Sequence, residues 1–185
     1  RGLRRKGPPM NTTARPGPTV RQTDLPGLSR RGKVRDIYHL EDHLLLVATD
    51  RVSAFDVVMN EPVPGKGVIL TQMSKFWLDT LPACKPHHLE YIVDDRHIPT
   101  GYESHVDALR GRAMYVRRVE IVPIECVVRG YLAGTGWKSY VESGQVCGHK
   151  LSAGLRRNER FPEPLFTPTT KAKVGHDEPL TFDEV

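Results

Sequence analysis

The chain has 185 residues, enough for one large domain or for one domain and part of a second. Its hydrophobic content is 38%, and its longest apolar runs are too short to span a bilayer. The net charge is +5, but residues 1–35 hold ten Lys/Arg and one Asp, so the remainder is −4. Because the excess of positive charge lies in the leading segment, the composition argues against a nucleic-acid-binding surface on the folded part.

Residues 1–22 are rich in Arg, Gly and Pro, contain no acidic residue and lack the apolar centre of a secretory signal. We expect a disordered basic leader, since such a composition buries too little apolar surface to fold. The cysteines Cys84, Cys126 and Cys147 are far apart and lack metal-ligand spacing. They predict free thiols in a reducing, cytoplasmic compartment, no metal site, and a buried core position for Cys126.

Residues 32–40 and 43–50 are separated by a short polar turn and predict a hairpin of two strands. Between residues 68 and 81, apolar side chains recur at three- and four-residue spacing and stop before a proline, which predicts a helix. Residues 87–95 read as a further strand.

In the second half of the chain the predicted elements are shorter and interrupted. Residues 112–132 predict two strands interrupted at Pro123, because proline cannot donate to a ladder. A short helix is expected to begin in residues 134–146, and residues 161–185 look extended. Strands dominate the first part with a single helix, so the predicted class is α+β.

The stretch around Lys33 and Arg35 is the first candidate site. Side chains two apart in a strand share a face, and Gly32 leaves the backbone open to close approach. Two cations beside a glycine suit a polyphosphate ligand. The alternative is a solvated edge strand with ordinary surface charges.

A dense set of polar residues follows the second strand of the hairpin, at Asp50, Arg51, Ser53 and Asp56. After a buried strand, such groups must be paired with one another or face a cleft. They could orient a ligand, or Asp50 and Arg51 could form a structural network.

Two further segments carry candidate residues. Arg129 ends a strand and precedes a Gly-rich turn with Thr135, where a new helix would present free N–H groups to an anion. A Pro-stiffened loop brings Lys171, His176 and Asp177. The alternatives are a tight strand-to-helix turn and a polar surface loop.

Taken together, the segments GKVRDIY, ATDRVSAFD, PGKGVILTQMSKFW, PIECVVRGYLAGTGWKSY and LFTPTTKAKVGHDE resemble the phosphoribosylaminoimidazole-succinocarboxamide synthase (SAICAR synthetase) family. The match runs from about Leu25 to Glu178. The resemblance implies a magnesium- and ATP-dependent ligase of purine biosynthesis. It would join L-aspartate to carboxyaminoimidazole ribotide through an acyl phosphate, releasing ADP and phosphate. It also implies a small twisted antiparallel sheet with one main helix, followed by the start of an α/β, ATP-grasp-like domain.

The same resemblance assigns roles to residues. Gly32, Lys33 and Arg35 would bind the ATP phosphates, with the adenine against Val116 and Val119. Arg129 and Asp177 would be the catalytic residues. The substrate-binding residues would be Asp50, Ser53, Arg129, Thr135, Lys171, His176 and Asp177. The partners would be small molecules, with no nucleic acid and no membrane.

Two family patterns, Asp-x-Lys-x-Glu and Pro-Asp-Ser-x-Arg, do not occur before the chain stops at Val185. We therefore expect a truncated form, with a nucleotide-binding domain at 23–118 and the start of a second, substrate and ATP domain at 119–185. The alternative function is an inactive fragment that binds nucleotide or ribotide. The sequence leaves the oligomeric state open.

Overall fold

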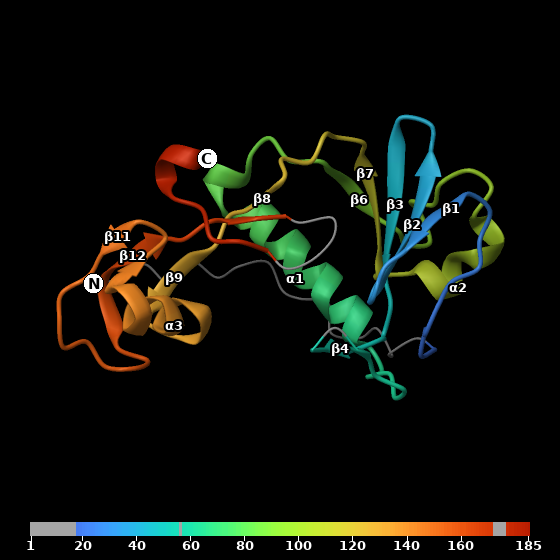
Figure 1. The fold of residues 1–185 in the computed structure, drawn as a ribbon. Helices are drawn as coiled ribbons and strands as arrows, with labels where there is room; N and C mark the ends of the chain where they lie inside the picture. Colours follow the sequence, from blue (N-terminus) through green and yellow to red (C-terminus); the bar gives the residue numbers. More distant parts are fainter. Residues whose placement is uncertain (1–17, 56, 172–176) are drawn as a thin grey trace, which may run out of the picture. The chain divides into compact units, whose positions relative to one another are not determined.

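The computed structural model describes residues 18–55, 57–171 and 177–185 (Figure 1). The chain divides after Val119 into two compact units, called unit 1 and unit 2 below. Across the described ranges, no helix is both long enough and apolar enough to cross a membrane.

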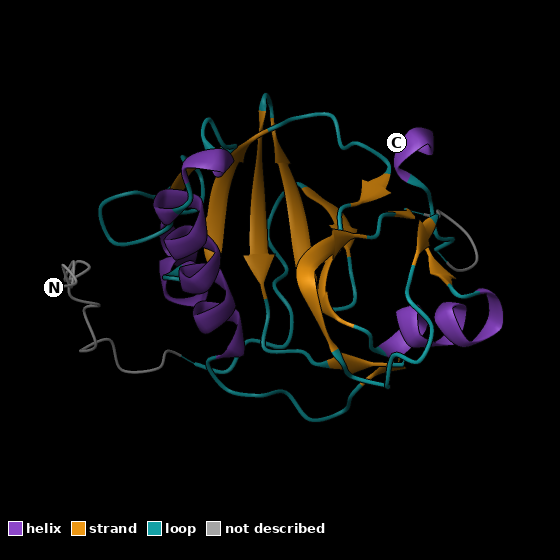
Figure 2. Ribbon diagram, turned by 90° about the vertical axis from the view of Figure 1, so that its left-hand side faces the viewer, coloured by secondary structure: helices purple, strands orange, loops and turns teal. Residues whose placement is uncertain are grey.

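Unit 1 is built on a five-stranded antiparallel sheet, shown in orange in Figure 2. Its strand order is β1 (Leu28–Arg31), β2 (Arg35–Leu40), β3 (His43–Ala48), β7 (Ala113–Arg117) and β6 (Leu89–Ile92). The remaining elements of unit 1 are short, apart from one helix: β4 (Ser53–Ala54), β5 (Val57–Val58), α1 (Lys66–Thr80), η1 (Pro82–Cys84), η2 (Glu103–His105) and α2 (Val106–Leu109). The predicted α+β class is confirmed.

The predicted hairpin is confirmed as β2 and β3, which pair from Arg35 with Ala48 to Leu40 with His43. In both strands every second side chain points to the same face of the sheet, so the buried positions of β2 and β3 enter one core. The core cluster of unit 1 consists of Leu25, Tyr38, Leu45, Val47, Val93, Tyr102, Leu109 and Ala113. Within it, the hydroxyl of Tyr38 donates to the carbonyl of Thr23 at 2.6 Å, so its one polar group is satisfied.

The predicted helix is confirmed as α1, but its orientation is unexpected. Gly67 and Thr71 are its buried residues. A Cβ on Gly67 would lie 2.1 Å from the carbonyl oxygen of Ala48, so only glycine permits this approach to β3. Val68 and Leu78 are half-buried, but the other large apolar side chains of the helix are 43–60% exposed; they are Ile69, Leu70, Met73, Phe76 and Trp77. Small residues therefore make the closest contact with the sheet, and most of the apolar stripe faces outward.

The expected leader is too long at its carboxyl end. Val20 is buried, and its N–H donates to Oδ2 of Asp50 at 2.8 Å. The carbonyl of Pro18 accepts a hydrogen bond from Nη2 of Arg112 at 3.2 Å. Residues 18–22 are thus part of the folded unit, and residues 1–17 lie outside the described residues.

The described residues of unit 2 form three small antiparallel ladders, one α-helix and one short 3-10 helix. Its elements are β8 (Ile124–Glu125), β9 (Val128–Tyr131), α3 (Gly134–Ser143), β10 (Gln145–Val146), β11 (His149–Lys150), β12 (Arg160–Phe166), β13 (Thr169–Thr170) and η3 (Phe182–Glu184). The ladders pair β12 with β9, β13 with β8, and β10 with β11.

Aromatic side chains of α3 cover the small core of unit 2. Leu132, Val146 and Phe161 are buried there, and Trp137 and Tyr140 pack against them. Cys126 is exposed, so its predicted core position is wrong. It follows a strand of two residues, too short to enforce an inward position. All three cysteines are free thiols.

Candidate functional site

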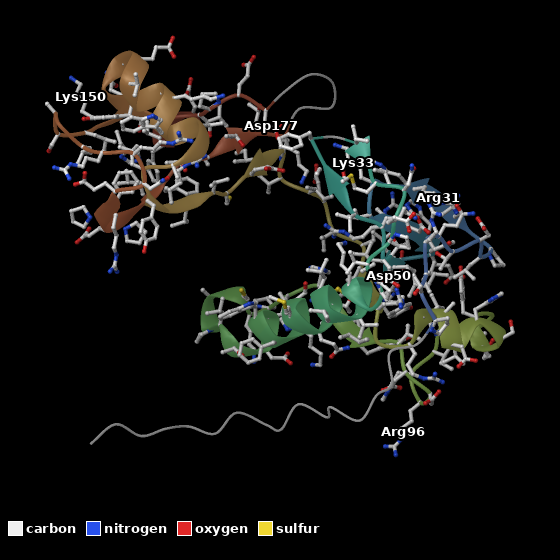
Figure 3. All side chains as sticks on the ribbon, turned by 90° about the horizontal axis from the view of Figure 1, so that it is seen from below. Arg31, Lys33, Asp50, Arg96, Lys150 and Asp177 are labelled. Atoms are coloured by element: carbon white, nitrogen blue, oxygen red, sulfur yellow. The ribbon has the colours of Figure 1, made fainter. Side chains whose placement is uncertain are left out.

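The turn between β1 and β2 carries the first predicted cations. Residues 32–34 lie outside both strands, and the N–H of Gly32 donates to the carbonyl of Arg35 at 2.7 Å to close the turn. The sequence-based placement of Lys33 in a strand with Arg35 is therefore wrong, because β2 begins only at Arg35. Lys33 and Arg35 are nevertheless both exposed. Lys33 is labelled on unit 1 in Figure 3.

Arg51 holds this turn from inside the unit. Its Nη2 donates to the carbonyl of Gly32 at 2.9 Å, and its Nε donates to the carbonyl of Lys33 at 3.0 Å. Its Nη1 donates to the carbonyl of Arg21 at 2.5 Å. The Arg51 side chain is only 11% exposed, so a single guanidinium organises the backbone on both sides of it.

Asp36 balances the charge of Arg51. Its Oδ1 accepts from Nη2 of Arg51 at 2.8 Å and from Nε of Arg31 at 3.3 Å. Its Oδ2 accepts from the N–H and the hydroxyl of Thr23 at 2.8 and 3.0 Å. The carboxylate is fully buried, and this set of donors compensates its loss of water.

Asp50 belongs to the packing of unit 1. It is 0% exposed, and its Oδ1 accepts from the N–H of Gly67 and pairs with Nη1 of Arg112, each at 2.9 Å. Its Oδ2 accepts from the N–H of Val20. This geometry favours the structural alternative over the predicted substrate-binding role, because internal donors contact both carboxylate oxygens. The ionic partner of Asp50, however, is Arg112 and not Arg51.

The pKa of the Asp50 carboxyl reflects these contacts. Burial opposes ionisation, but the N–H groups of Gly67 and Val20 and the charge of Arg112 outweigh it. Together they hold the pKa of Asp50 below its ordinary value. The group therefore stays ionised inside the unit at neutral pH.

Lys66, at the start of α1, is a candidate that the sequence reasoning missed. Burial lowers the pKa of its ammonium most, Asp50 opposes this shift, and the charges of Arg35 and Arg51 lower the pKa further. The positive charge of Arg35 therefore acts on Lys66, so the two cations belong to the same region of unit 1. The available signal was the segment PGKG, which repeats the Gly-Lys pair of the β1–β2 turn but was read only as a turn.

The two residues predicted to bind adenine differ in their exposure to solvent. Val116 is 1% exposed in β7, so its side chain packs inside unit 1 and offers no open surface. Val119 is 56% exposed and follows the end of β7. Ser53 is half-buried in β4, paired with Val58 of β5, and the neighbouring Asp56 lies outside the described residues.

In unit 2, the structure brings Arg129 and Thr135 together. Nη2 of Arg129 donates to Oγ1 of Thr135 at 2.8 Å, and its Nε donates to Oγ1 of Thr167 at 3.0 Å. Thr167 is fully buried, and its hydroxyl donates onward to the carbonyl of Val127 at 3.2 Å. The guanidinium is thus held at the first turn of α3, where N–H groups of a helix favour anions.

Close packing of α3 helps to fix Arg129. Gly136 is buried, and a Cβ there would lie 3.4 Å from Cδ of Arg129. Cys147 lies within electrostatic range on the same unit. Burial raises the pKa of its thiol, while the charge of Arg129 opposes this shift.

The loop residues predicted to bind substrate are on the surface where they are described. Lys171 is exposed and pairs with Glu125 at 3.7 Å. Asp177 is exposed and is labelled on unit 2 in Figure 3. His176 lies outside the described residues. The described residues contain no group of three or more His, Cys, Asp or Glu side chains that could hold a metal ion.

These features define a class: an α+β protein of two units, each presenting cationic side chains suited to anionic ligands. Residues 28–185 match the family model described as SAICAR synthetase, and the chain belongs to that family. The resemblance seen in the sequence is confirmed.

The relatives and solved structures agree with this assignment. The chain is 54% identical over 171 residues to the phosphoribosylaminoimidazole-succinocarboxamide synthase of Syntrophotalea carbinolica, and 50% identical over 169 residues to that of Trichlorobacter lovleyi. Each match covers 90% of this chain and 57% of the relative, so the chain spans little more than half the length of these relatives. The SAICAR synthase of Saccharomyces cerevisiae, solved in complex with SAICAR, matches with a TM-score of 0.76 and 40% identity. That match covers 88% of this chain and 56% of the yeast chain.

A more distant structure shares the fold alone. It is a type-2 SAICAR synthetase in complex with ADP, with a TM-score of 0.57 and 21% identity. The match covers 83% of this chain and 55% of that chain.

Proposed function

We propose that this protein serves the ATP-dependent ligation of L-aspartate to carboxyaminoimidazole ribotide in purine biosynthesis. The products would be SAICAR, ADP and phosphate, formed through an acyl phosphate in the cytoplasm. The observation that carries the proposal is the 54% identity over 171 residues to a curated synthase. The outward-facing cations of unit 1 are consistent with it, because making an acyl phosphate crowds several anionic groups together.

Unit 1 would bind the ATP phosphates. Lys33 and Arg35 are exposed beside the Gly32 turn, and Lys66 carries a lowered pKa near Arg35. A phosphate would accept charge-assisted hydrogen bonds from these cations, and such bonds are about twice as strong as neutral ones. Adenine would lie near Val119, which is exposed. Val116 is buried, which leaves it a supporting position behind the surface.

Unit 2 would bind the ribotide. Arg129 and Thr135 form one hydrogen-bonded group at the start of α3, and a guanidinium suits the bidentate binding of a carboxylate or phosphate. Asp177, Lys171, His176 and Ser53 remain proposed as further substrate contacts. In this assignment Arg129 stabilises the carboxylate that becomes activated, and Asp177 has a catalytic role.

Magnesium would supply charge neutralisation of the nucleotide phosphates. The described residues offer no group of three candidate ligands, and Asp36 and Asp50 are occupied by internal donors. We therefore assign no magnesium ligand to this chain and derive no step from the ion.

A second candidate function concerns these 185 residues taken by themselves, which span 57% of the relatives. They would bind nucleotide or ribotide without turnover. The two functions are separated by incubating the purified chain with ATP, magnesium, ribotide and aspartate and measuring SAICAR by mass spectrometry. SAICAR formation above a no-enzyme control supports the ligase. No SAICAR, together with saturable ATP binding, supports the binding protein, and the absence of both contradicts each of them.

A further inference from the structure

Arg51 makes an unusual set of contacts for an arginine beside a cation-rich turn. Its guanidinium binds three backbone carbonyls, those of Arg21, Gly32 and Lys33, and the carboxylate of Asp36. It thus uses Nε, Nη1 and Nη2 on protein acceptors. With a side chain only 11% exposed, Arg51 is committed to the interior and presents little surface to a ligand.

The direction of these hydrogen bonds fixes the direction of the turn's N–H groups. In a trans peptide the C=O and the N–H point in opposite directions. The carbonyl of Gly32 shares a peptide group with the N–H of Lys33, and the carbonyl of Lys33 shares one with the N–H of Val34. Since Arg51 draws both carbonyls toward itself, the two N–H groups are turned away from it.

Two successive N–H groups turned to one side form a concavity that favours an anion. In this turn the pair lies beside the exposed side chain of Lys33, and the exposed Arg35 follows one residue after Val34. The charge of Arg51 is balanced by Asp36, so Arg51 would act on an anion through the backbone that it holds rather than through its own charge.

We propose that Arg51 is a positioning residue of the phosphate-binding turn. It does not touch the nucleotide. It holds the carbonyls of Gly32 and Lys33 inward, so that the N–H groups of Lys33 and Val34 face the phosphates before the nucleotide arrives. This inference rests on the proposed binding of ATP phosphates by unit 1.

Arg31 offers a matched control on the same network. Its Nε also donates to Oδ1 of Asp36, at 3.3 Å, and its Nη2 donates to the carbonyl of Thr23 at 2.7 Å. No contact of its side chain with the carbonyls of Gly32 or Lys33 is found among the described residues. Arg31→Ala and Arg51→Ala therefore both remove a donor from Asp36, whereas only Arg51→Ala releases the turn.

The test compares the affinities of the 185-residue chain for ATP·Mg and for adenosine by calorimetry. The dissociation constant for adenosine divided by that for ATP·Mg isolates the contribution of the phosphates to binding. We expect Arg51→Ala to lower this ratio about tenfold, equivalent to about 1.4 kcal/mol, with adenosine affinity unchanged. Arg31→Ala should keep the ratio within about twofold, although thermal unfolding should show that both variants are less stable. Arg51→Lys should fall between wild type and Arg51→Ala, because one ammonium cannot reproduce the planar fork of donors.

Three results would overturn the inference. The ratio could be unchanged in both Arg51→Ala and Arg51→Lys. Arg51→Ala could lose as much affinity for adenosine as for ATP·Mg, or Arg31→Ala could lower the ratio as much as Arg51→Ala does. Failure of the proposed function looks different. In that case the wild-type chain shows no preference for ATP over adenosine, or Lys33→Ala leaves the preference unchanged. If Arg51→Ala does not fold, the same ratio is measured for Arg51→Lys: a lowered ratio supports the inference, and an unchanged ratio contradicts it.

Discussion

Nη1 of Arg112 lies 2.9 Å from Oδ1 of Asp50, and both side chains are almost completely buried. The pair joins the segment after β3 to the residue before β7. Asp50 also accepts hydrogen bonds from the N–H groups of Val20 and Gly67. One ion pair therefore ties together the first described residues, the sheet and the start of α1.

Breaking this pair should destabilise unit 1. Arg112→Met keeps much of the side-chain volume but leaves the buried carboxylate without its cation, which typically costs about 3–5 kcal/mol. Urea unfolding followed by circular dichroism measures the loss. Arg110→Met is the matched control, because Arg110 pairs with Asp107 and Asp95 on the surface, where such pairs contribute about 0–1 kcal/mol. Equal effects of the two variants would contradict a dominant buried pair.

The stability of unit 1 should fall in acid because of Asp50. Its pKa is lower in the folded unit than the ordinary 3.8, so the folded state favours the ionised form. The resulting stabilisation is fully present above the unfolded pKa and is lost as the pH falls through the folded value. Urea midpoints measured from pH 6 down to pH 2 should decrease below about pH 4. Asp50→Asn should be less stable at pH 6 and should show a shallower decrease; a parallel decrease would exclude Asp50 as a cause.

Gly67→Ala should destabilise the protein even though alanine is the better helix former. On an exposed helical surface this exchange stabilises by about 1 kcal/mol. Here the new Cβ would lie 2.1 Å from the carbonyl oxygen of Ala48, so α1 must move from β3. We expect a net cost of about 1–3 kcal/mol, as for other overpacked sites, in thermal or urea unfolding. Ser74→Ala in the same helix, at an exposed position, should be close to neutral; a stabilised Gly67→Ala would show that the contact with β3 is loose.

Ribotide binding should depend on the hydroxyl of Thr135. Thr135→Val removes the acceptor 2.8 Å from Nη2 of Arg129 and leaves the guanidinium less well oriented. We expect ribotide affinity to fall about three- to tenfold, in line with about 0.5–1.5 kcal/mol for one hydrogen bond. ATP affinity should not change, since Thr135 belongs to unit 2. Thr135→Ser, which keeps the hydroxyl, should bind like wild type, and a loss in that variant would point to packing of the methyl group instead.

The sequence predicted the regular elements better than their contacts. The short polar turn between residues 32–40 and 43–50 placed the β2–β3 hairpin, and periodicity with a following proline placed α1. Periodicity could not say which face of α1 meets the sheet, and the outward stripe with Trp77 and Phe76 reverses the usual expectation. Only the close approach of Gly67 to Ala48 fixes that face, and it joins residues far apart in the chain.

The candidate site shows the same division. The family motifs pointed to Lys33, Arg129 and Thr135, and the structure joins the last two directly. The expected Asp50–Arg51 pair was wrong, because Arg112, the ionic partner of Asp50, comes from a distant segment and Arg51 pairs with Asp36. Three of the contacts of Arg51 are to backbone carbonyls, which no side-chain pattern reveals.

The central claim is that the β1–β2 turn of unit 1 binds the phosphates of ATP. It is tested most directly by titrating ATP·Mg into the purified 185-residue chain and its Lys33→Ala variant by calorimetry, with circular dichroism to show that each is folded. Lys150→Ala, at an exposed position of unit 2, is the matched control. We predict saturable binding to wild type, unchanged binding to Lys150→Ala, and affinity at least about tenfold weaker in Lys33→Ala, as expected for loss of a charge-assisted contact worth about 1.5–3 kcal/mol. Equal binding by a folded Lys33→Ala, or no binding by folded wild type, would contradict the claim.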